Sequence, residues 1–145
     1  MKKLSINNLL LYELVKNEVA DGSSIRIKAQ GNSMRPFVRG DCDELILNKP
    51  NEETFNKGSI VLARLKEGRL VAHRIAKTKG HTLVLRGDGN LSAMEVVQPK
   101  DIVAEVIAVS RHKKTIRKGS LGWNKYRYLW PSRPLLRKIL LNLYR

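Results

Sequence analysis

Apolar and polar residues alternate along much of the chain, which is the pattern of strands that bury one face. The clearest run is residues 24–29, where Ile25, Ile27 and Ala29 alternate with polar neighbours. Further β-rich runs follow at residues 43–47, 59–64, 70–76, 82–86, 101–110 and 114–117. Many short strands separated by turns predict a mainly β fold with an antiparallel, partly closed, barrel-like sheet. Residues 91–101 are expected to form a loop or a single helical turn.

Helical spacing of apolar residues occurs near both ends of the chain. Residues 5–20 predict an N-terminal helix that ends at Asp21-Gly22. After Pro134, five apolar residues fall on one helical face, with arginine and lysine around the rest: Leu135, Leu136, Ile139, Leu140 and Leu143. The expected organisation is an N-terminal helix in residues 1–23, one β domain over residues 24–118, and an amphipathic segment over residues 119–145.

The positive charge is concentrated at the C-terminal end. The chain of 145 residues has a formal net charge of +15, and residues 111–145 hold 11 Lys and Arg with no Asp or Glu. Both tryptophans lie in residues 121–131. A cationic, amphipathic segment with flanking aromatic residues is typical of a helix that lies at a membrane surface. We therefore expect peripheral membrane contact through residues 121–145 and no specific nucleic-acid partner.

The remaining composition indicates a cytoplasmic protein. No apolar run reaches the roughly 18 residues that a membrane-spanning helix requires. Charged and polar residues interrupt the N-terminal apolar stretch, so it does not resemble a signal peptide. The single cysteine, Cys42, provides neither a disulfide within the chain nor a metal cluster, and we expect no cofactor.

The segment Gly-Asn-Ser-Met-Arg-Pro at residues 31–36 directly follows the first alternating run. A serine between a glycine-led turn and a proline can present its hydroxyl at the rim of a sheet. A serine hydroxyl is a weak nucleophile unless a base activates it, and His73 is the candidate base. Ser33 alone would more commonly be a turn former, and His73 alone a structural histidine; the segments described next favour catalysis for both.

Four segments in this order resemble the superfamily of type I signal peptidases and LexA-type serine peptidases over about residues 24–110. They are residues 31–36 with Ser33, residues 57–61, residues 71–75 with His73, and residues 86–90. Because bacterial type I signal peptidases carry a lysine where this chain has His73, the chain is most similar to the Ser-His branch of archaea and the endoplasmic reticulum. The resemblance implies a serine endopeptidase that cuts an extended signal or leader peptide, with Ser33 as nucleophile and His73 as general base.

The third catalytic residue is left open by the sequence. Asp88 matches the Gly-Asp box of the superfamily, and we assign it as a site carboxylate on that basis. In the Ser-His branch a further aspartate follows the box, but this chain has Glu95 in that region. Either a triad with Asp88 or Glu95 or a Ser-His dyad is therefore compatible with the sequence. A carboxylate that orients the histidine contributes orders of magnitude in rate.

The resemblance also implies how the substrate is held. The oxyanion hole would consist of the Ser33 backbone N–H with a donor from Gly31 or Asn32, since the developing charge needs donors on the same turn. The peptide would lie as an added strand beside residues 24–30, with small side chains near the cut. We expect three residues to contact it: Ile25, Ile27 and Met34.

Two other functions remain as alternatives. The chain could be a catalytically silent relative that only binds extended peptides. It could also be a regulator related to the self-cleaving repressors, with its basic tail on nucleic-acid phosphates. The second is disfavoured because residues 1–23 are too short for a helix-turn-helix domain and because His73 replaces the lysine.

Overall fold

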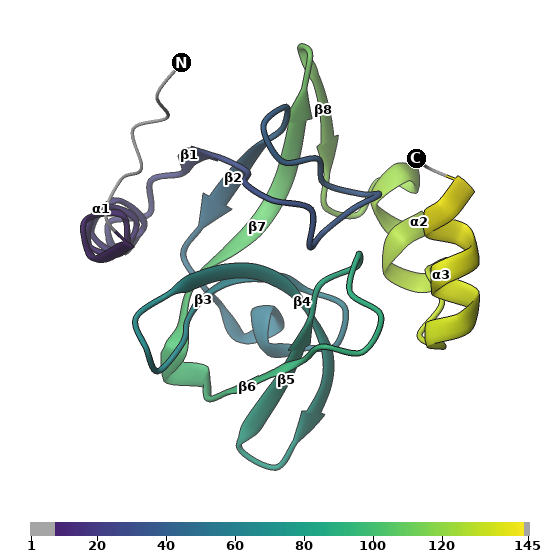
Figure 1. Cartoon of the computed structure of the whole chain (residues 1–145). Helices are drawn as coiled ribbons and strands as arrows, with labels where there is room; N and C mark the ends of the chain where they lie inside the picture. The colour runs from purple at the N-terminus through teal and green to yellow at the C-terminus, as the bar shows by residue number, and fades with distance from the viewer. Residues whose placement is uncertain (1–7, 144–145) are drawn as a thin grey trace.

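The computed structural model describes residues 8–143 and consists mainly of β-strands, with helices at both ends of the chain (Figure 1). The helices are α1 (Asn8–Ala20), α2 (Leu121–Leu129) and α3 (Pro134–Leu143). The strands are β1 (Ile25–Lys28), β2 (Glu44–Asn48), β3 (Ile60–Arg64), β4 (Leu70–Lys79), β5 (Thr82–Arg86), β6 (Glu95–Val97), β7 (Ile102–Arg111) and β8 (Lys114–Arg117). Residues 5–7 of the expected N-terminal helix lie outside the described residues, as does the end of the basic tail at 144–145.

The eight strands form one antiparallel sheet in the order β1-β2-β7-β3-β4-β5-β6, and β8 pairs with β7. The mainly β, antiparallel fold is therefore confirmed. The sheet is not closed, because its end strands β1 and β6 do not pair with each other. The two end strands are short, with four residues in β1 and three in β6, and among the described strands each pairs with a single neighbour.

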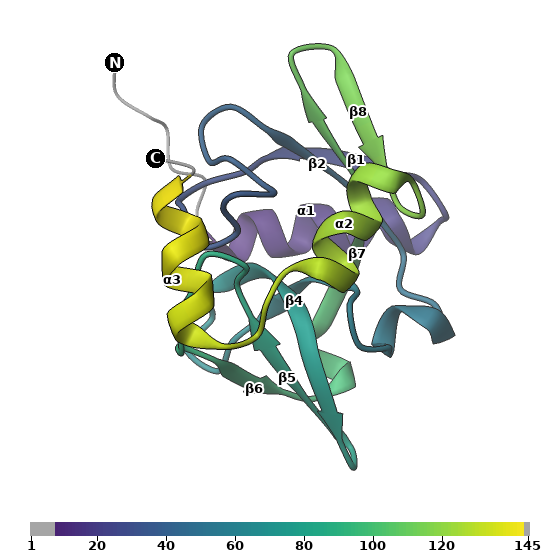
Figure 2. The same cartoon turned by 90° about the vertical axis from the view of Figure 1, so that its right-hand side faces the viewer.

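The helices cover opposite sides of the sheet, with α1 on one side and α2 and α3 on the other (Figures 1 and 2). Helix α1 buries Val15 and Val19 in the hydrophobic core and ends at Ala20, and it is followed by Gly22, whose positive φ of 90° favours glycine. Helix α2 contributes the buried Trp123 to the same core. The start of the C-terminal segment is therefore an integral part of the domain.

Two elements differ from expectation. Residues 95–97 form the edge strand β6, where a loop or helical turn was expected, because they pair with β5. The C-terminal segment forms two helices, and α2 begins at Ser120, whose hydroxyl accepts a hydrogen bond from the Trp123 N–H. Within residues 8–143, none of the helices combines the length and the apolar character needed to cross a bilayer.

Candidate active site

Ser33 lies on the turn that follows β1, and a second turn at residues 87–90 packs directly against it. The Gly89 N–H donates a hydrogen bond of 2.8 Å to the Ser33 carbonyl. A Cβ at Gly87 would lie 2.2 Å from the Ser33 carbonyl oxygen, and one at Gly89 would lie 2.6 Å from that of Asn32. Glycine is required at both positions because a side chain would separate the two turns. We call residues 87–90 the supporting turn.

Ser33 and His73 meet although they are 40 positions apart in the chain. The Ser33 Oγ and the His73 Nε2 are 3.0 Å apart, within reach for direct proton transfer. His73 lies on β4 opposite Val61 of β3, which fixes its position in the sheet. Its ring is buried, whereas Ser33 remains partly exposed. The structure thus brings together the two side chains on which the sequence interpretation depends.

Glu95, the first residue of β6, contacts the other nitrogen of the same ring. Its carboxylate hydrogen-bonds the His73 Nδ1 from the side opposite Ser33. An ionised carboxylate only accepts hydrogen bonds, so it favours the proton on Nδ1 and leaves the Nε2 lone pair facing the serine hydroxyl. Hydroxyl, imidazole and carboxylate therefore stand in the order that nucleophilic catalysis by a serine would require.

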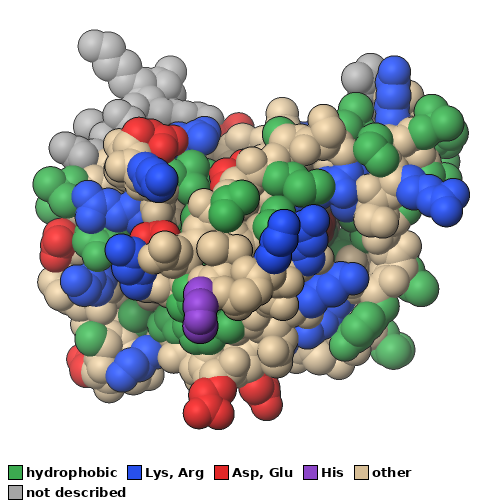
Figure 3. Space-filling model, turned by 90° about the horizontal axis from the view of Figure 1, so that it is seen from below, with side chains coloured by type: hydrophobic (Ala, Val, Ile, Leu, Met, Phe, Trp, Pro, Cys, Tyr) green, Lys and Arg blue, Asp and Glu red, His purple; other side chains and the backbone are tan. Residues whose placement is uncertain are grey.

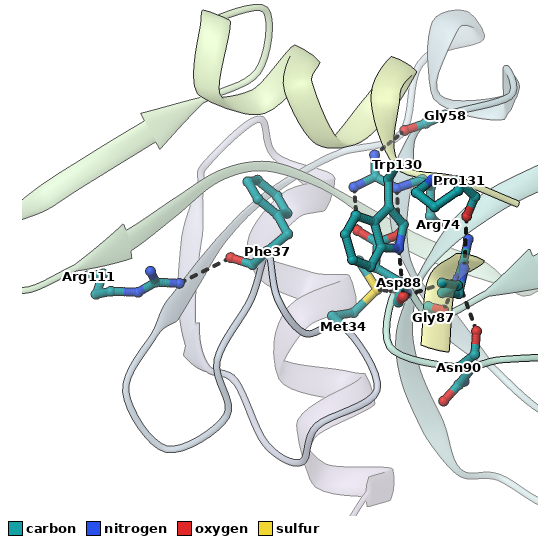
Figure 4. A network of polar contacts seen from close by, with 11 residues as sticks. Met34, Phe37, Gly58, Arg74, Gly87, Asp88, Asn90, Arg111, Trp130 and Pro131 are labelled. Carbon is teal, nitrogen blue, oxygen red and sulfur yellow. Dashed lines mark hydrogen bonds and ion pairs between the residues drawn. The ribbon is translucent and has the colours of Figure 1, made fainter. Parts of the chain in front are cut away.

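Asp88 does not lie at His73, and its assignment as a catalytic residue is corrected. Its side chain is 2% exposed and accepts two hydrogen bonds, of 2.8 and 2.7 Å, from the Arg74 guanidinium. Arg74 also donates to the Gly58 carbonyl at 2.9 Å (Figure 4). Because neighbouring residues of a strand point to opposite faces, a carboxylate that pairs with Arg74 is turned away from His73. Asp88 is therefore part of the support for the site.

Two residues of the C-terminal segment donate hydrogen bonds to the backbone of the supporting turn. The indole N–H of Trp130 donates to the Asp88 carbonyl at 2.8 Å (Figure 4). Arg137 Nη1 donates to three carbonyl oxygens of this turn, those of Gly87 at 3.0 Å, Asp88 at 3.1 Å and Asn90 at 3.0 Å. Burial, together with the nearby charge of Arg86, lowers the pKa of Arg137 to about 10, so it stays protonated at neutral pH. The sequence interpretation missed this contact because Arg137 reads as a solvent-facing charge.

The other end of the Ser33 turn is fixed by Arg111. Its guanidinium makes two hydrogen bonds of 2.7 Å to the buried carboxylate of Asp43 and one of 3.1 Å to the Phe37 carbonyl. The hydrogen bonds and charge of Asp43 raise the pKa of Arg111 above its ordinary value. The basic run at 111–114 therefore begins with a structural residue, and is not a wholly solvated face as its composition suggests.

A cavity of about 130 Å³ opens beside Ser33 and His73. Its walls come mainly from the end of β1, the Ser33 turn and the start of β4, and include Ala29, Gly31, Met34, Leu70 and Ala72. Met34 thus lies where substrate contact was expected. Ile25 and Ile27 pack against the hydrophobic core instead of lining the cavity.

The backbone at Ser33 can supply a donor to an oxyanion. No described residue accepts a hydrogen bond from the Ser33 N–H, whereas the Asn32 carbonyl accepts one from Arg35 at 3.1 Å. Gly31, with a positive φ of 75°, starts the turn and lines the cavity. The expected oxyanion donors are therefore adjacent to the nucleophile.

Neither a protein-family model nor a curated protein matches this chain. The geometry of the site consequently carries the functional argument.

Proposed function

We propose that this protein is a serine endopeptidase that cleaves an extended signal or leader peptide. The observation that carries the proposal is the arrangement of the Ser33 hydroxyl, the His73 ring and the Glu95 carboxylate in one line of contacts beside a small cavity. A serine that bonds a histidine whose second nitrogen meets a carboxylate is the arrangement used for acyl transfer.

In the proposed reaction His73 first acts as base. Its Nε2 takes the proton of the Ser33 hydroxyl while the oxygen attacks the carbonyl carbon of the scissile peptide bond. Glu95 stabilises the imidazolium that forms, and the Ser33 N–H with a donor at Gly31 or Asn32 stabilises the oxyanion. His73 then returns the proton to the leaving amine. A water molecule, activated by the same nitrogen, hydrolyses the acyl-enzyme and restores the serine.

Two free strand edges next to the cavity support an extended substrate. Among the described strands β1 pairs with β2 alone, and the part of β4 at residues 70–73 pairs with β3 alone, because pairing with β5 begins at Arg74. A peptide laid between these edges would gain backbone hydrogen bonds from both. The cavity of about 130 Å³ favours a small side chain at the position next to the cut.

The proposal extends to the superfamily that the sequence resembles. We infer a fold and activity similar to the Ser-His branch of the signal peptidases, with Glu95 in the role of its second aspartate. The contact of Glu95 with His73 supports a triad over a dyad.

A serine-reactive fluorophosphonate probe tests the mechanism without knowledge of the natural substrate. The Ser33 oxygen should attack the phosphorus and displace fluoride, so the intact protein should be phosphonylated once, at Ser33, as read by mass spectrometry of the protein and of its peptides. Ser33→Ala should abolish labelling. His73→Ala should reduce its rate by roughly 10²-fold or more, because the base that activates the serine is lost.

Ser92→Ala is the matched control, because Ser92 is an exposed serine only three residues before Glu95 in the chain. It should label as the unaltered protein does. Labelling that persists in Ser33→Ala, or an unchanged rate in His73→Ala, contradicts the mechanism. A protein that binds extended peptides but is never labelled would instead be the catalytically silent relative.

A further inference from the structure

Helix α3 buries a charged residue and exposes apolar ones, the reverse of an ordinary surface helix. Its one buried residue is Arg137, which is 6% exposed and bonded to the supporting turn. Four of its apolar residues are exposed, with Leu135 at 72%, Leu136 at 47%, Ile139 at 52% and Leu143 at 75%, whereas Leu140 and Leu141 are half-buried. A surface helix of a globular protein normally turns its apolar stripe to the core and its charges to water. Its most buried contact is therefore made by a charged side chain, and most of its apolar residues are uncovered.

Helix α2 shows the same division between an anchored side and an uncovered side. Trp123 is buried in the core, where its ring meets Phe37 edge-on at 5.2 Å between centroids. On the outside, Leu121 is 91% exposed, Tyr128 71% and Leu129 76%. Figure 2 shows α2 and α3 together in front of the sheet. We call the exposed residues of both helices the outer face: Leu121, Tyr128, Leu129, Leu135, Leu136, Ile139 and Leu143.

Positive charge surrounds this outer face. Lys125, Arg133 and Lys138 are exposed on or between the two helices, and the chain has no Asp or Glu after Glu105. A cavity of about 360 Å³ between these helices and strands β4 and β5 is lined by five basic side chains and one carboxylate: Lys57, Arg74, Arg86, Arg127 and Arg137, with Asp88. Arg74, Arg86 and Arg137 are buried there, so of these five only Lys57 and Arg127 add to the charge near the outer face. In Figure 3, Lys and Arg side chains lie beside hydrophobic side chains on the right-hand half of the surface, the side on which Figure 1 shows α2 and α3.

We propose that the outer face of α2 and α3 docks on an anionic phospholipid surface. The exposed leucines and isoleucine would enter the acyl region, Tyr128 would lie at the headgroups, and the lysines and arginines would contact lipid phosphates. A second copy of the chain fits less well, because two such cationic faces repel each other. Nucleic acid would use the charges but not the apolar residues. This inference goes beyond the peptidase proposal and does not depend on it.

Docking would also set the position of the catalytic residues. Arg137 and Trp130 join the two helices to the supporting turn, which contacts the Ser33 turn. A membrane held by the outer face would therefore lie at a constant distance from Ser33.

Flotation of the full-length chain with lipid vesicles tests the proposal. The protein should float with phosphatidylglycerol vesicles and bind phosphatidylcholine vesicles roughly ten-fold or more weakly, because the attraction to anionic lipid is lost. Leu135→Ser with Ile139→Ser should weaken binding to phosphatidylglycerol by roughly ten-fold, because both side chains would otherwise be buried in lipid. Lys125→Gln with Lys138→Gln should weaken it by roughly five-fold or more.

Val96→Ser is the matched control, because Val96 is 65% exposed on β6, far from these helices in the chain. It should bind as the unaltered protein does. Circular dichroism of each variant should match that of the unaltered chain. Equal binding by the Leu135→Ser, Ile139→Ser variant, or no binding to phosphatidylglycerol, overturns the proposal. A lipid-free dimer that these two substitutions dissociate would assign the face to a second copy and overturn it as well.

Discussion

Two carboxylates approach neighbouring residues of β4, and their surroundings differ. Glu95 contacts His73, whereas Asp88 pairs with Arg74, the next residue along the strand. The Glu95 side chain is 17% exposed and belongs to the short edge strand β6. The Asp88 side chain is 2% exposed and lies among backbone groups held by the C-terminal helices.

This difference separates a carboxylate that would orient the proposed base from one that supports the fold. Glu95 contacts His73, which gains and loses a proton in the proposed reaction. Its role there would be to orient the His73 ring and to stabilise the positive charge on it. Asp88 contacts Arg74, which is permanently charged. Its carboxylate therefore compensates the charge of a buried guanidinium. The sequence motif favoured Asp88 as the carboxylate of the site, whereas the observed contact with His73 favours Glu95.

Glu95→Gln gives the sharpest test of the comparison. We expect the rate of fluorophosphonate labelling at Ser33 to fall by roughly 10²- to 10⁴-fold, because a neutral amide no longer favours the productive tautomer or stabilises the imidazolium. The melting temperature should change little. An unchanged labelling rate would mean that Ser33 and His73 act as a dyad.

Asp88→Asn should act mainly on stability. Removing one partner of a buried ion pair leaves the Arg74 charge uncompensated, and we expect a loss of about 3–5 kcal/mol in the free energy of unfolding. Urea denaturation followed by tryptophan fluorescence measures it.

Glu67→Gln is the control for Asp88→Asn, because Glu67 pairs with Arg69 at 3.3 Å on the surface with both side chains 60% exposed. It should change the free energy of unfolding by about 1 kcal/mol or less. Equal losses in the two variants would show that the Asp88 pair contributes no more than a surface pair.

Arg137→Met should have the smallest effect of the series. The substitution keeps much of the side-chain volume but removes the donors to the supporting turn. We expect a loss of about 1.5–3 kcal/mol in the free energy of unfolding, the contribution of a hydrogen bond from a charged group. Thermal and urea unfolding measure it.

Arg133→Met is the matched control for Arg137→Met, since Arg133 is exposed just before the same helix. It should stay within about 0.5 kcal/mol of the unaltered chain. A larger loss at Arg133 than at Arg137 would be inconsistent with α3 being anchored through Arg137.

Much of the fold could be predicted because it depends on local periodicity. Alternation placed β1 and most later strands within a few residues of their observed bounds, and Asp21-Gly22 marked the end of α1. β6 was missed because three residues carry too little periodicity to distinguish a strand from a loop. Closure of the sheet could not be predicted, since it depends on whether its two end strands meet in space.

The sequence by itself determined the strands and the turn that presents Ser33, because these follow from residue types at close spacing. The choice of His73 as partner came from the order of the four segments that carry the resemblance. The tertiary structure alone decided which carboxylate meets His73. It also decided that Arg137 faces inward while the leucines of α3 face outward. Both outcomes depend on contacts between distant segments: the pairing of β5 with β6 brings Glu95 to the ring, and the supporting turn offers Arg137 its carbonyls.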